Sequence, residues 1–343
     1  MKILVIGPSW VGDMVMSQCL YKLLKQRYPE AQLDVLAPKW CSALLSRMPE
    51  VDNAITMPIG HGSMQLSLRY KMGKQLAGIY DWAIIQPNSF KSAFIPLFAG
   101  IKKRTAWKGE SRYFIINDLR SNRDNFPLMI ERYGALAFDK KDMVNNKALP
   151  KLPFPSLTVN EIQRQGAINK LELSLDKKIL GLCPGAEFGP AKRWPDSHYA
   201  KVAQERIEAG WQVWIFGGEK DQQVGQLIRS QISEASQKHC INLAGKTSLS
   251  EAVDLLSLPQ VVVSNDSGLM HIAAAHNRPL VAIYGSSSPK YTPPLCDHVR
   301  SLHPDIECRP CFKKQCKFGH IKCLTEILPA RVISSIKSLM AEK

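Results

Sequence analysis

Short apolar stretches alternate with helical patterns in two successive series, and this alternation restricts the fold more than any other feature of the chain. The first series predicts strands at 2–6, 33–37, 53–57 and 81–86, separated by helices at 14–27, 41–48 and 67–76. The second predicts strands at 178–183, 212–216, 240–242, 260–264 and 280–284, with helices at 198–209, 222–233, 250–256 and 269–276. Strands that alternate with helices form parallel sheets covered on both faces. We therefore expect an α/β protein with two doubly wound domains.

A proline-rich segment separates the two series. Residues 149–155 contain Pro150, Pro153 and Pro155, and such a segment continues neither a helix nor a central strand. The 343 residues also suffice for two domains of ordinary size. We expect an N-terminal domain over 1–155, a C-terminal domain over 156–327 and an amphipathic helix within 328–343.

The chain is strongly basic. Its 45 Lys and Arg residues against 30 Asp and Glu residues give a net charge of +15, and residues 1–150 hold 21 basic against 12 acidic residues. This excess predicts an anionic partner, either nucleic acid, phosphorylated lipid or a membrane surface. The first apolar run stops at Gly7, and the stretch 92–101 is broken by Pro96, so neither reads as a signal sequence or a membrane span. We expect a cytoplasmic protein, at most peripheral on a membrane.

The loop after the first predicted strand, 7–13, reads GPSWVGD. It lacks the G-x-G-x-x-G fingerprint, and no acidic residue ends the second strand, which disfavours dinucleotide binding. Asp13 falls where a helix begins, so on local grounds it is a cap or first-turn acid that satisfies backbone N–H groups.

Two loops of the second series have compositions suited to binding phosphate groups. The loop 183–195 reads CPGAEFGPAKRWP, in which glycines permit close backbone approach and Lys192 and Arg193 are cationic donors, although a solvated basic loop has the same composition. In the segment 261–271 an apolar strand is followed by Asp266, Ser267 and Gly268, and a helix begins at once. This arrangement predicts a diphosphate-binding site. His271 is equally consistent with a packed core histidine. Glu219, after another strand, either accepts hydrogen bonds from sugar hydroxyls or lies in an ordinary turn.

Two further segments carry unusual compositions. The stretch 101–123 contains seven cationic residues interleaved with Trp107, Tyr113 and Phe114, which suits phosphate, lipid or sugar phosphate but matches no nucleic-acid module. Four cysteines follow a C-x2-C-x4-C-x6-C pattern at Cys308, Cys311, Cys316 and Cys323. Such spacing favours a tetrahedral zinc or iron site, with His320 as a substitute ligand, and a cytoplasmic location disfavours disulfides.

Taken together, these loops resemble those of glycosyltransferase family 9, the heptosyltransferases of lipopolysaccharide core synthesis. The most specific matches are GPSWVGDMVMSQ at 7–18, PNSFKSA at 87–93, CPGAEFGPAKRWP at 183–195, NDSGLMHIAAA at 265–275 and NRPLVAIYG at 277–285. The resemblance implies a GT-B architecture, in which two Rossmann-like domains face a central cleft and the last helix returns toward the N-terminal domain. It also implies an inverting transfer of heptose from ADP-heptose to the first heptose of the inner core. The GPSWVGD and PNSFKSA forms favour that acceptor over the heptose-free acceptor of type I enzymes or another family 9 acceptor.

The same resemblance implies roles for individual residues. Asp13 matches the general base, and Lys192 with the helix start at 267–268 would stabilise the departing ADP without a metal or other cofactor. The implied donor-binding residues are Ser9, Glu219, Leu243, Gly245, Asp266, Ser267, Gly268 and His271. The implied acceptor-binding residues are Ser89, Lys91 and Arg112. The implied partners are ADP-heptose, the anionic lipid A–Kdo–heptose acceptor and the cytoplasmic face of the inner membrane, with no nucleic acid.

Two other classes of protein fit part of the pattern. A basic nucleic-acid-binding protein with a metal module would bind in a steeply salt-dependent way and would not bind ADP, and the two phosphate-type loops argue against it. A nicotinamide-dependent sugar enzyme is disfavoured by the missing fingerprint.

Overall fold

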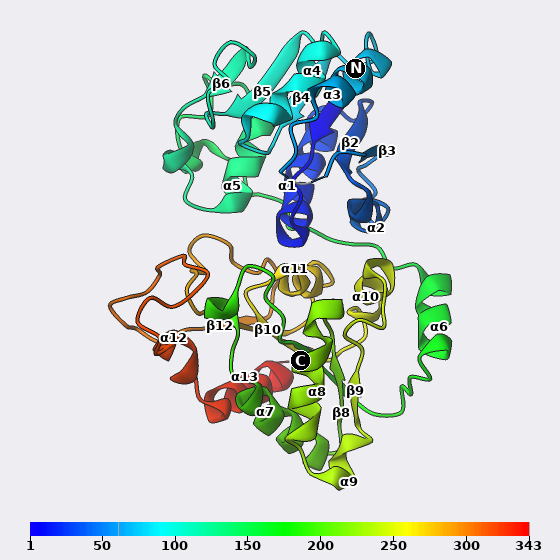
Figure 1. The fold of residues 1–343 in the computed structure, drawn as a ribbon, viewed down its shortest axis with the longest axis vertical. Helices are drawn as coiled ribbons and strands as arrows, with labels where there is room; N and C mark the ends of the chain where they lie inside the picture. Colours follow the sequence, from blue (N-terminus) through cyan, green and yellow to red (C-terminus); the bar gives the residue numbers. More distant parts are fainter. Residues whose placement is uncertain (61, 343) are drawn as a thin grey trace. The chain divides into compact units, whose positions relative to one another are not determined.

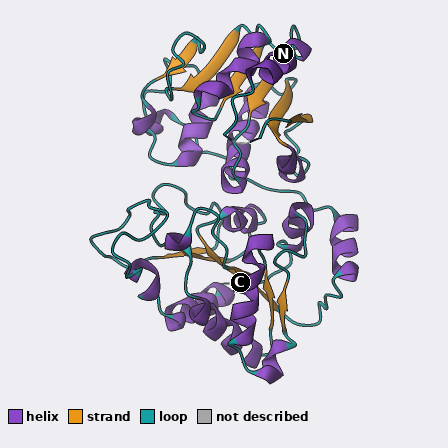
Figure 2. Ribbon diagram, in the orientation of Figure 1, coloured by secondary structure: helices purple, strands orange, loops and turns teal. Residues whose placement is uncertain are grey.

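The computed structural model describes residues 1–60 and 62–342, and the chain forms two compact units, Met1–Pro155 and Ser156–Lys343 (Figure 1). The division falls at the end of the proline-rich segment. Each unit consists of a strand layer with helices packed against it (Figure 2). Both units are therefore α/β, as the alternation of strands and helices predicts.

The first unit contains a six-stranded parallel sheet in the order β3-β2-β1-β4-β5-β6. Its strands are β1 (Lys2–Ile6), β2 (Gln32–Pro38), β3 (Asn53–Met57), β4 (Trp82–Ile85), β5 (Lys103–Trp107) and β6 (Asp118–Arg120). In the register of the sheet, Val5 of β1 lies between Val35 of β2 and Ile84 of β4. These central strands are nearly all apolar because helices cover both faces of a parallel sheet.

Helices of the first unit bury the sheet on both sides. They are α1 (Val11–Arg27), α2 (Ser42–Leu45), α3 (Leu66–Gln75), α4 (Phe94–Phe98) and α5 (Met129–Gly134). One core cluster joins Leu4, Ile6 and Ile85 of the sheet to Met72 of α3 and Ile95 of α4. The sheet and these helices hold the loops that leave the carboxyl ends of β1 and β4.

The second unit repeats the strand order of the first. Its parallel sheet runs β12-β11-β10-β7-β8-β9, with β7 (Ile179–Cys183), β8 (Gln212–Ile215), β9 (Cys240–Asn242), β10 (Val261–Asn265), β11 (Leu280–Ile283) and β12 (Val299–Leu302). Counted from the first strand of each unit, both orders are 3-2-1-4-5-6, the order of the dinucleotide-binding doubly wound fold. The strand order reverses between β1 and β4 in one sheet and between β7 and β10 in the other.

Helices of the second unit are α6 (Glu161–Lys170), α7 (Asp196–Glu208), α8 (Gln222–Ser230), α9 (Glu234–Gln237), α10 (Leu249–Leu255), α11 (Gly268–Ala275), α12 (Lys322–Thr325) and α13 (Pro329–Ala341). The side chains of Val332, Ile336 and Leu339 in α13 are fully buried in one cluster with sheet and α7 residues of this unit. Each such burial stabilises the fold by roughly 1.5–3 kcal/mol. The apolar face of α13 is therefore used within the second unit, and the return of this helix toward the N-terminal domain stays a prediction.

The basic stretch 101–123 differs from the expected open surface. It contains two strands, β5 and β6, which extend the first sheet, and Trp107 is buried there. Arg112 and Arg120 are also buried, since their guanidinium groups donate to backbone carbonyls of Pro87, Trp107, Ala135 and Phe138. Cationic residues that alternate with apolar ones therefore occur in strands of this stretch as well as on the protein surface.

Among the described residues, no helix has the length and apolar character that crossing a bilayer requires.

Candidate active site

The reversal of strand order in the second sheet brings two predicted loops together. Strands β7 and β10 are neighbours, with Cys183 paired to Ser264, so the loop that follows β7 and the loop that follows β10 leave the same edge of the sheet. Ligands of doubly wound sheets bind at this kind of edge, next to the reversal. The sequence motifs at 183–195 and 265–271 thus lie at the position where this fold binds ligands.

An ion pair joins the two loops. Lys192 Nζ lies 2.5 Å from Asp266 Oδ2, and the exposed fractions of the two side chains are 17% and 5%. Lys192 belongs to a short 3-10 turn, Pro190–Lys192, in the first loop. The hydroxyl of Ser287 donates to the same carboxylate oxygen at 2.5 Å. The buried carboxylate therefore holds the lysine in place, and two of the three ammonium protons stay available for anionic oxygens.

Asn265 fastens the same two loops from beneath. Its side-chain oxygen accepts hydrogen bonds from the backbone N–H of Trp194, at 3.1 Å, and from the hydroxyl of Tyr199, at 3.0 Å. Its side-chain amide donates to the carbonyl of Pro184 at 2.6 Å. Asn265 is fully buried, so it positions the site and does not meet a ligand. Asn265 was not predicted as a positioning residue, although an amide residue at the end of an apolar strand could have indicated it.

Helix α11 begins at Gly268, two residues after Asp266 of the ion pair. Ser267 is its N-cap residue and makes no side-chain cap hydrogen bond, and Ser267 and Gly268 are half-exposed. The first-turn N–H groups of a helix have no intrahelical acceptors and lie at the positive end of the dipole, so they suit an anion. One turn on, His271 is buried beside Asp266 and Lys192, and burial lowers its pKa to about 4. His271 is therefore neutral at physiological pH.

The loops after β8 and β9 lie next to each other. Gly245 has φ +72, donates its N–H to the carbonyl of Gly217 at 3.1 Å, and would place an added Cβ 3.2 Å from the Cα of Glu219. Glu219 is exposed, so its carboxylate is accessible to a sugar hydroxyl. Leu243 differs from its predicted role, because its side chain is buried and its N–H and C=O bond to Ile215 and Lys246. Leu243 supports the loop from the core.

The first unit presents Ser9 and Asp13 at the corresponding reversal, between β1 and β4. Both residues are half-exposed, and Asp13 lies in the first turn of α1, whose N-cap residue, Trp10, makes no side-chain cap hydrogen bond. Ser17 donates to the carbonyl of Asp13 at 2.7 Å, and Gln86, at the end of β4, donates to Ser17 at 2.9 Å. This chain of bonds ties the start of α1 to the neighbouring strand and fixes the backbone that carries Asp13.

Three residues were predicted to bind the acceptor, and the structure separates them. Ser89 and Lys91 are half-exposed in the loop after β4. Arg112 is 1% exposed, and its guanidinium donates to the carbonyls of Pro87 at 2.6 Å and Trp107 at 2.8 Å and to the hydroxyl of Ser92 at 3.0 Å. Burial lowers its pKa to about 10, which leaves it charged. Arg112 is therefore a clamp beneath the 87–93 loop, which corrects its predicted acceptor contact.

The four predicted metal ligands lie in one loop-rich segment of the second unit, and all four thiols are free. The other three thiols lie near enough to Cys323 to contribute, after burial, to raising its pKa to about 11. Backbone N–H groups of 318–321 donate to the sulfur of Cys316 and lower its pKa. No group of three or more His, Cys, Asp or Glu side chains within 1–60 and 62–342 is arranged to hold a metal ion.

With this geometry established, similarity to known proteins decides the family. The model of glycosyltransferase family 9 (heptosyltransferase) matches residues 69–322. Lipooligosaccharide heptosyltransferase 2 of Haemophilus ducreyi is 52% identical over 350 residues, which cover 99% of this chain and 100% of that protein. The chain belongs to glycosyltransferase family 9. This family member is thus an enzyme of the glycosyltransferase class.

Solved structures agree with this assignment. The structure of Escherichia coli ADP-heptose lipopolysaccharide heptosyltransferase II superposes with a TM-score of 0.90 at 49% identity and covers 100% of this chain and 99% of that one. The predicted α/β GT-B fold class is confirmed. A type 1 relative, lipopolysaccharide heptosyltransferase 1 of Pseudomonas aeruginosa, is 24% identical over 99% of this chain and 98% of that protein. The Haemophilus ducreyi type 2 relative, at 52% identity, is therefore much more similar to this chain than this type 1 relative.

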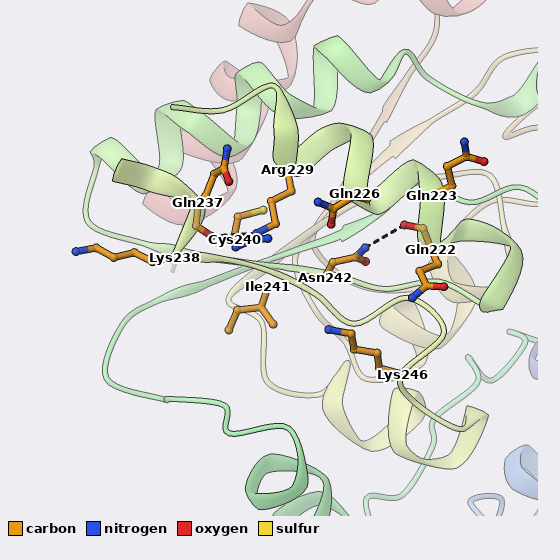
Figure 3. A pocket seen from close by; sticks show the side chains of 10 residues that line it. All are labelled: Gln222, Gln223, Gln226, Arg229, Gln237, Lys238, Cys240, Ile241, Asn242 and Lys246. Atoms are coloured by element: carbon orange, nitrogen blue, oxygen red, sulfur yellow. Dashed lines mark hydrogen bonds between the residues drawn. The ribbon is translucent and has the colours of Figure 1, made fainter. Parts of the chain in front are cut away.

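A surface pocket of about 550 Å³ lies along α8 and the edge strand β9 (Figure 3). Glutamine side chains and the cationic ends of Arg229, Lys238 and Lys246 surround it, and Asn242 bonds to the carbonyl of Gln222 within it. Of the residues that line it, Lys246 alone comes from the 243–247 loop. The residues that match the family 9 motifs lie outside this pocket.

Proposed function

We propose that the protein transfers L-glycero-D-manno-heptose from ADP-heptose to the first heptose of the lipopolysaccharide inner core, with inversion at the anomeric carbon. About half of its residues are identical over full length to heptosyltransferase 2 proteins, and this observation carries the proposal. The Lys192–Asp266 pair and the start of α11 supply the anion-binding chemistry that a nucleoside diphosphate donor requires.

The proposed chemistry divides between the two units. A sugar hydroxyl is a weak nucleophile at neutral pH, so Asp13 removes its proton as it attacks the anomeric carbon. The bond from that carbon to the β-phosphate oxygen breaks, and negative charge develops on ADP. Lys192 and the N–H groups of Ser267 and Gly268 stabilise that charge, without a metal ion. Glu219 and Asp266 accept hydrogen bonds from sugar hydroxyls, and Ser9 and neutral His271 also contact the donor.

The test is release of ADP from ADP-heptose with two acceptor lipids that differ by one heptose. Release only with the heptose-bearing acceptor supports the proposal. Release with the heptose-free acceptor overturns the acceptor assignment in favour of the type I reaction. No release with either acceptor overturns the donor assignment.

We also propose that the four cysteines hold one structural zinc or iron ion. The support is the thiolate-type spacing of four cysteines that form no disulfide and lie in one segment, although their described side chains are not arranged around an ion. Elemental analysis after mild purification should give about one metal per chain, and Cys308→Ser with Cys311→Ser should remove it. Cys296→Ala, a change at a buried cysteine outside the segment, should retain the metal. A wild-type protein without metal would contradict the proposal.

We further propose that the protein works at the cytoplasmic face of the inner membrane and contacts it through Tyr113 and Phe114. These side chains are 52% and 101% exposed in one loop, and the Lys108 ammonium lies 5.7 Å from the Tyr113 ring centre. Exposed aromatic residues beside cations suit an anionic bilayer surface, and the buried Arg112 holds the loop from within.

Sedimentation with vesicles of phosphatidylethanolamine and phosphatidylglycerol tests this contact. Phe114→Ser should lower the bound fraction several-fold and leave ADP affinity unchanged. The matched control is Ile162→Ser in α6, at a side chain that is 87% exposed, and it should bind vesicles as the wild type does. Equal losses in both variants would show that the Tyr113–Phe114 loop is not the contact.

A further inference from the structure

The segment 308–323 touches the candidate donor site through an arginine that the family motifs do not include. Arg309 is half-buried, and its guanidinium Nε donates to the carbonyl of Gly285 at 2.9 Å. Its Nη2 donates to the carbonyl of Ser287 at 2.8 Å. One planar group thus holds two carbonyls of the loop that follows β11.

That loop reaches the ion pair directly. The hydroxyl of Ser287 is buried and donates to Asp266 Oδ2 at 2.5 Å, the oxygen that also faces Lys192 Nζ at 2.5 Å. The backbone of Ser287 is therefore held by Arg309, and its side chain orients the carboxylate that holds the lysine. Arg309 itself is not hydrogen-bonded to Asp266 or Lys192, so any influence passes through the loop.

A second connection links the same segment to the turn that carries Lys192. The carbonyl of Lys314 accepts a hydrogen bond from the N–H of Ala191 at 3.1 Å, and the N–H of Phe312 donates to Ser286 at 2.8 Å. Gly189 permits this approach, since an added Cβ would lie 2.6 Å from the Lys314 oxygen and φ there is +150. The segment therefore supports both loops of the ion pair.

We propose that Arg309 is a positioning residue for donor binding, which fixes the 285–287 loop so that Ser287 and Asp266 aim Lys192 at the donor diphosphate. This inference rests on the proposed function, because it takes Lys192 and Asp266 as the diphosphate-binding pair. A guanidinium spans two carbonyls in a fixed plane, whereas a lysine ammonium reaches one of them and a methionine reaches neither.

The test compares three variants for ADP affinity, for KM of donor and acceptor, and for thermal stability. Arg309→Met should weaken ADP binding and raise the donor KM about tenfold while the acceptor KM stays unchanged, since the lost bonds are charge-assisted. Arg309→Lys should recover part of this loss. Arg331→Met is the matched control, because Arg331 is exposed and donates to one carbonyl, that of His303, at 3.3 Å. It should bind ADP as the wild type does.

A double-mutant cycle separates positioning from general stability. If Arg309 acts through Ser287, then Arg309→Met should change ADP affinity less than twofold once Ser287→Ala is present. The same tenfold loss in both backgrounds, or an equal rise of both KM values, would overturn the inference. The variant Lys192→Ala distinguishes failure of this inference from failure of the proposed function. If it leaves ADP affinity intact, the proposed donor site fails; if it weakens ADP binding and Arg309→Met does not, only this inference fails.

Discussion

Asp13 shows how one side chain can satisfy two interpretations. It lies in the first turn of α1, where an acid stabilises the helix dipole, and this turn follows β1 at the strand-order reversal, where an acid can act as a base. The two roles make different demands. A first-turn acid adds at most about 1 kcal/mol to the helix through its charge, and asparagine loses that contribution without removing the helix, whereas a base needs a carboxylate that takes a proton.

Asp13→Asn therefore separates the two roles. We expect kcat to fall by about 100-fold to 10,000-fold, because the amide cannot accept the proton of the attacking hydroxyl. ADP affinity should stay within about twofold of wild type, since the change removes no donor to phosphate. Steady-state kinetics and ADP titration measure both quantities. Asp124→Asn, at an exposed acid of the same unit, is the control, and a near-normal kcat for Asp13→Asn would leave Asp13 only its role as a first-turn acid of α1.

The positions of site side chains were predictable where a motif carried them and not where burial decided them. The Lys192 and Asp266 motifs pointed to adjacent loops because parallel strands end at one edge of a sheet. Arg112 and Leu243 were assigned to ligands because charge and loop position are visible in a sequence, whereas the carbonyls that surround a guanidinium come from distant residues. Asn265 and Arg309 were missed for the same reason, since each acts through backbone groups that only the folded chain assembles.

The strands that the apolar pattern did not predict lie at or next to one edge of each sheet. The nine strands predicted from alternation all form; the central ones are continuously apolar because they are buried on both faces, and the edge strands β3 and β9 were also predicted. The edge strands β6 and β12 and the neighbouring β5 were not predicted. β5 begins with Lys103 and Arg104, which are only partly buried, and β12 contains Arg300 and Ser301. Edge strands have one neighbour and less burial, so their sequences carry a weaker signal.

Helix packing gives a prediction at this scale. Gly73 of α3 faces α4 so closely that an added Cβ would lie 2.4 Å from the Cβ of Phe98, whereas an added Cβ at Gly166 of α6 meets no atom within 4 Å. Gly73→Ala should lower the free energy of unfolding by about 1–3 kcal/mol, because the two helices must separate. Gly166→Ala should raise it by about 0.5–1 kcal/mol, since alanine favours an exposed helix. Denaturant unfolding measures both, and equal effects would contradict the close packing of α3 on α4.

At the scale of the whole molecule, the buried His271 and the half-buried His276 make stability depend on pH. Burial lowers the pKa of His271 and of His276 to about 4 in the folded state, from the ordinary histidine value of 6.5. The unfolded chain therefore binds protons between these values that the folded chain does not. Stability contributed by the neutral histidines is present above about pH 6.5 and is lost as the pH falls toward 4.

His276→Gln should remove part of this pH dependence. The glutamine amide can still bond to the carbonyl of Val253, which His276 Nε2 meets at 2.9 Å, and it does not titrate. We expect the loss in free energy of unfolding between pH 7 and pH 4.5 to shrink, by at most roughly 3 kcal/mol. Urea unfolding at a series of pH values measures it. His298→Gln, at a partly exposed histidine, is the control, and an unchanged slope in His276→Gln would refute the assignment.

The strand order described above also sets a sequence of events during translation. In the second unit, β7 pairs with β10, and two strands and four α-helices must leave the ribosome between them. The apolar face that receives Val332, Ile336 and Leu339 stays open until α13 emerges. The first unit can close its sheet once β6 has emerged, while the nascent second unit still exposes unpaired strands and apolar surface. We therefore expect chaperone demand during synthesis to come mainly from residues 179–328.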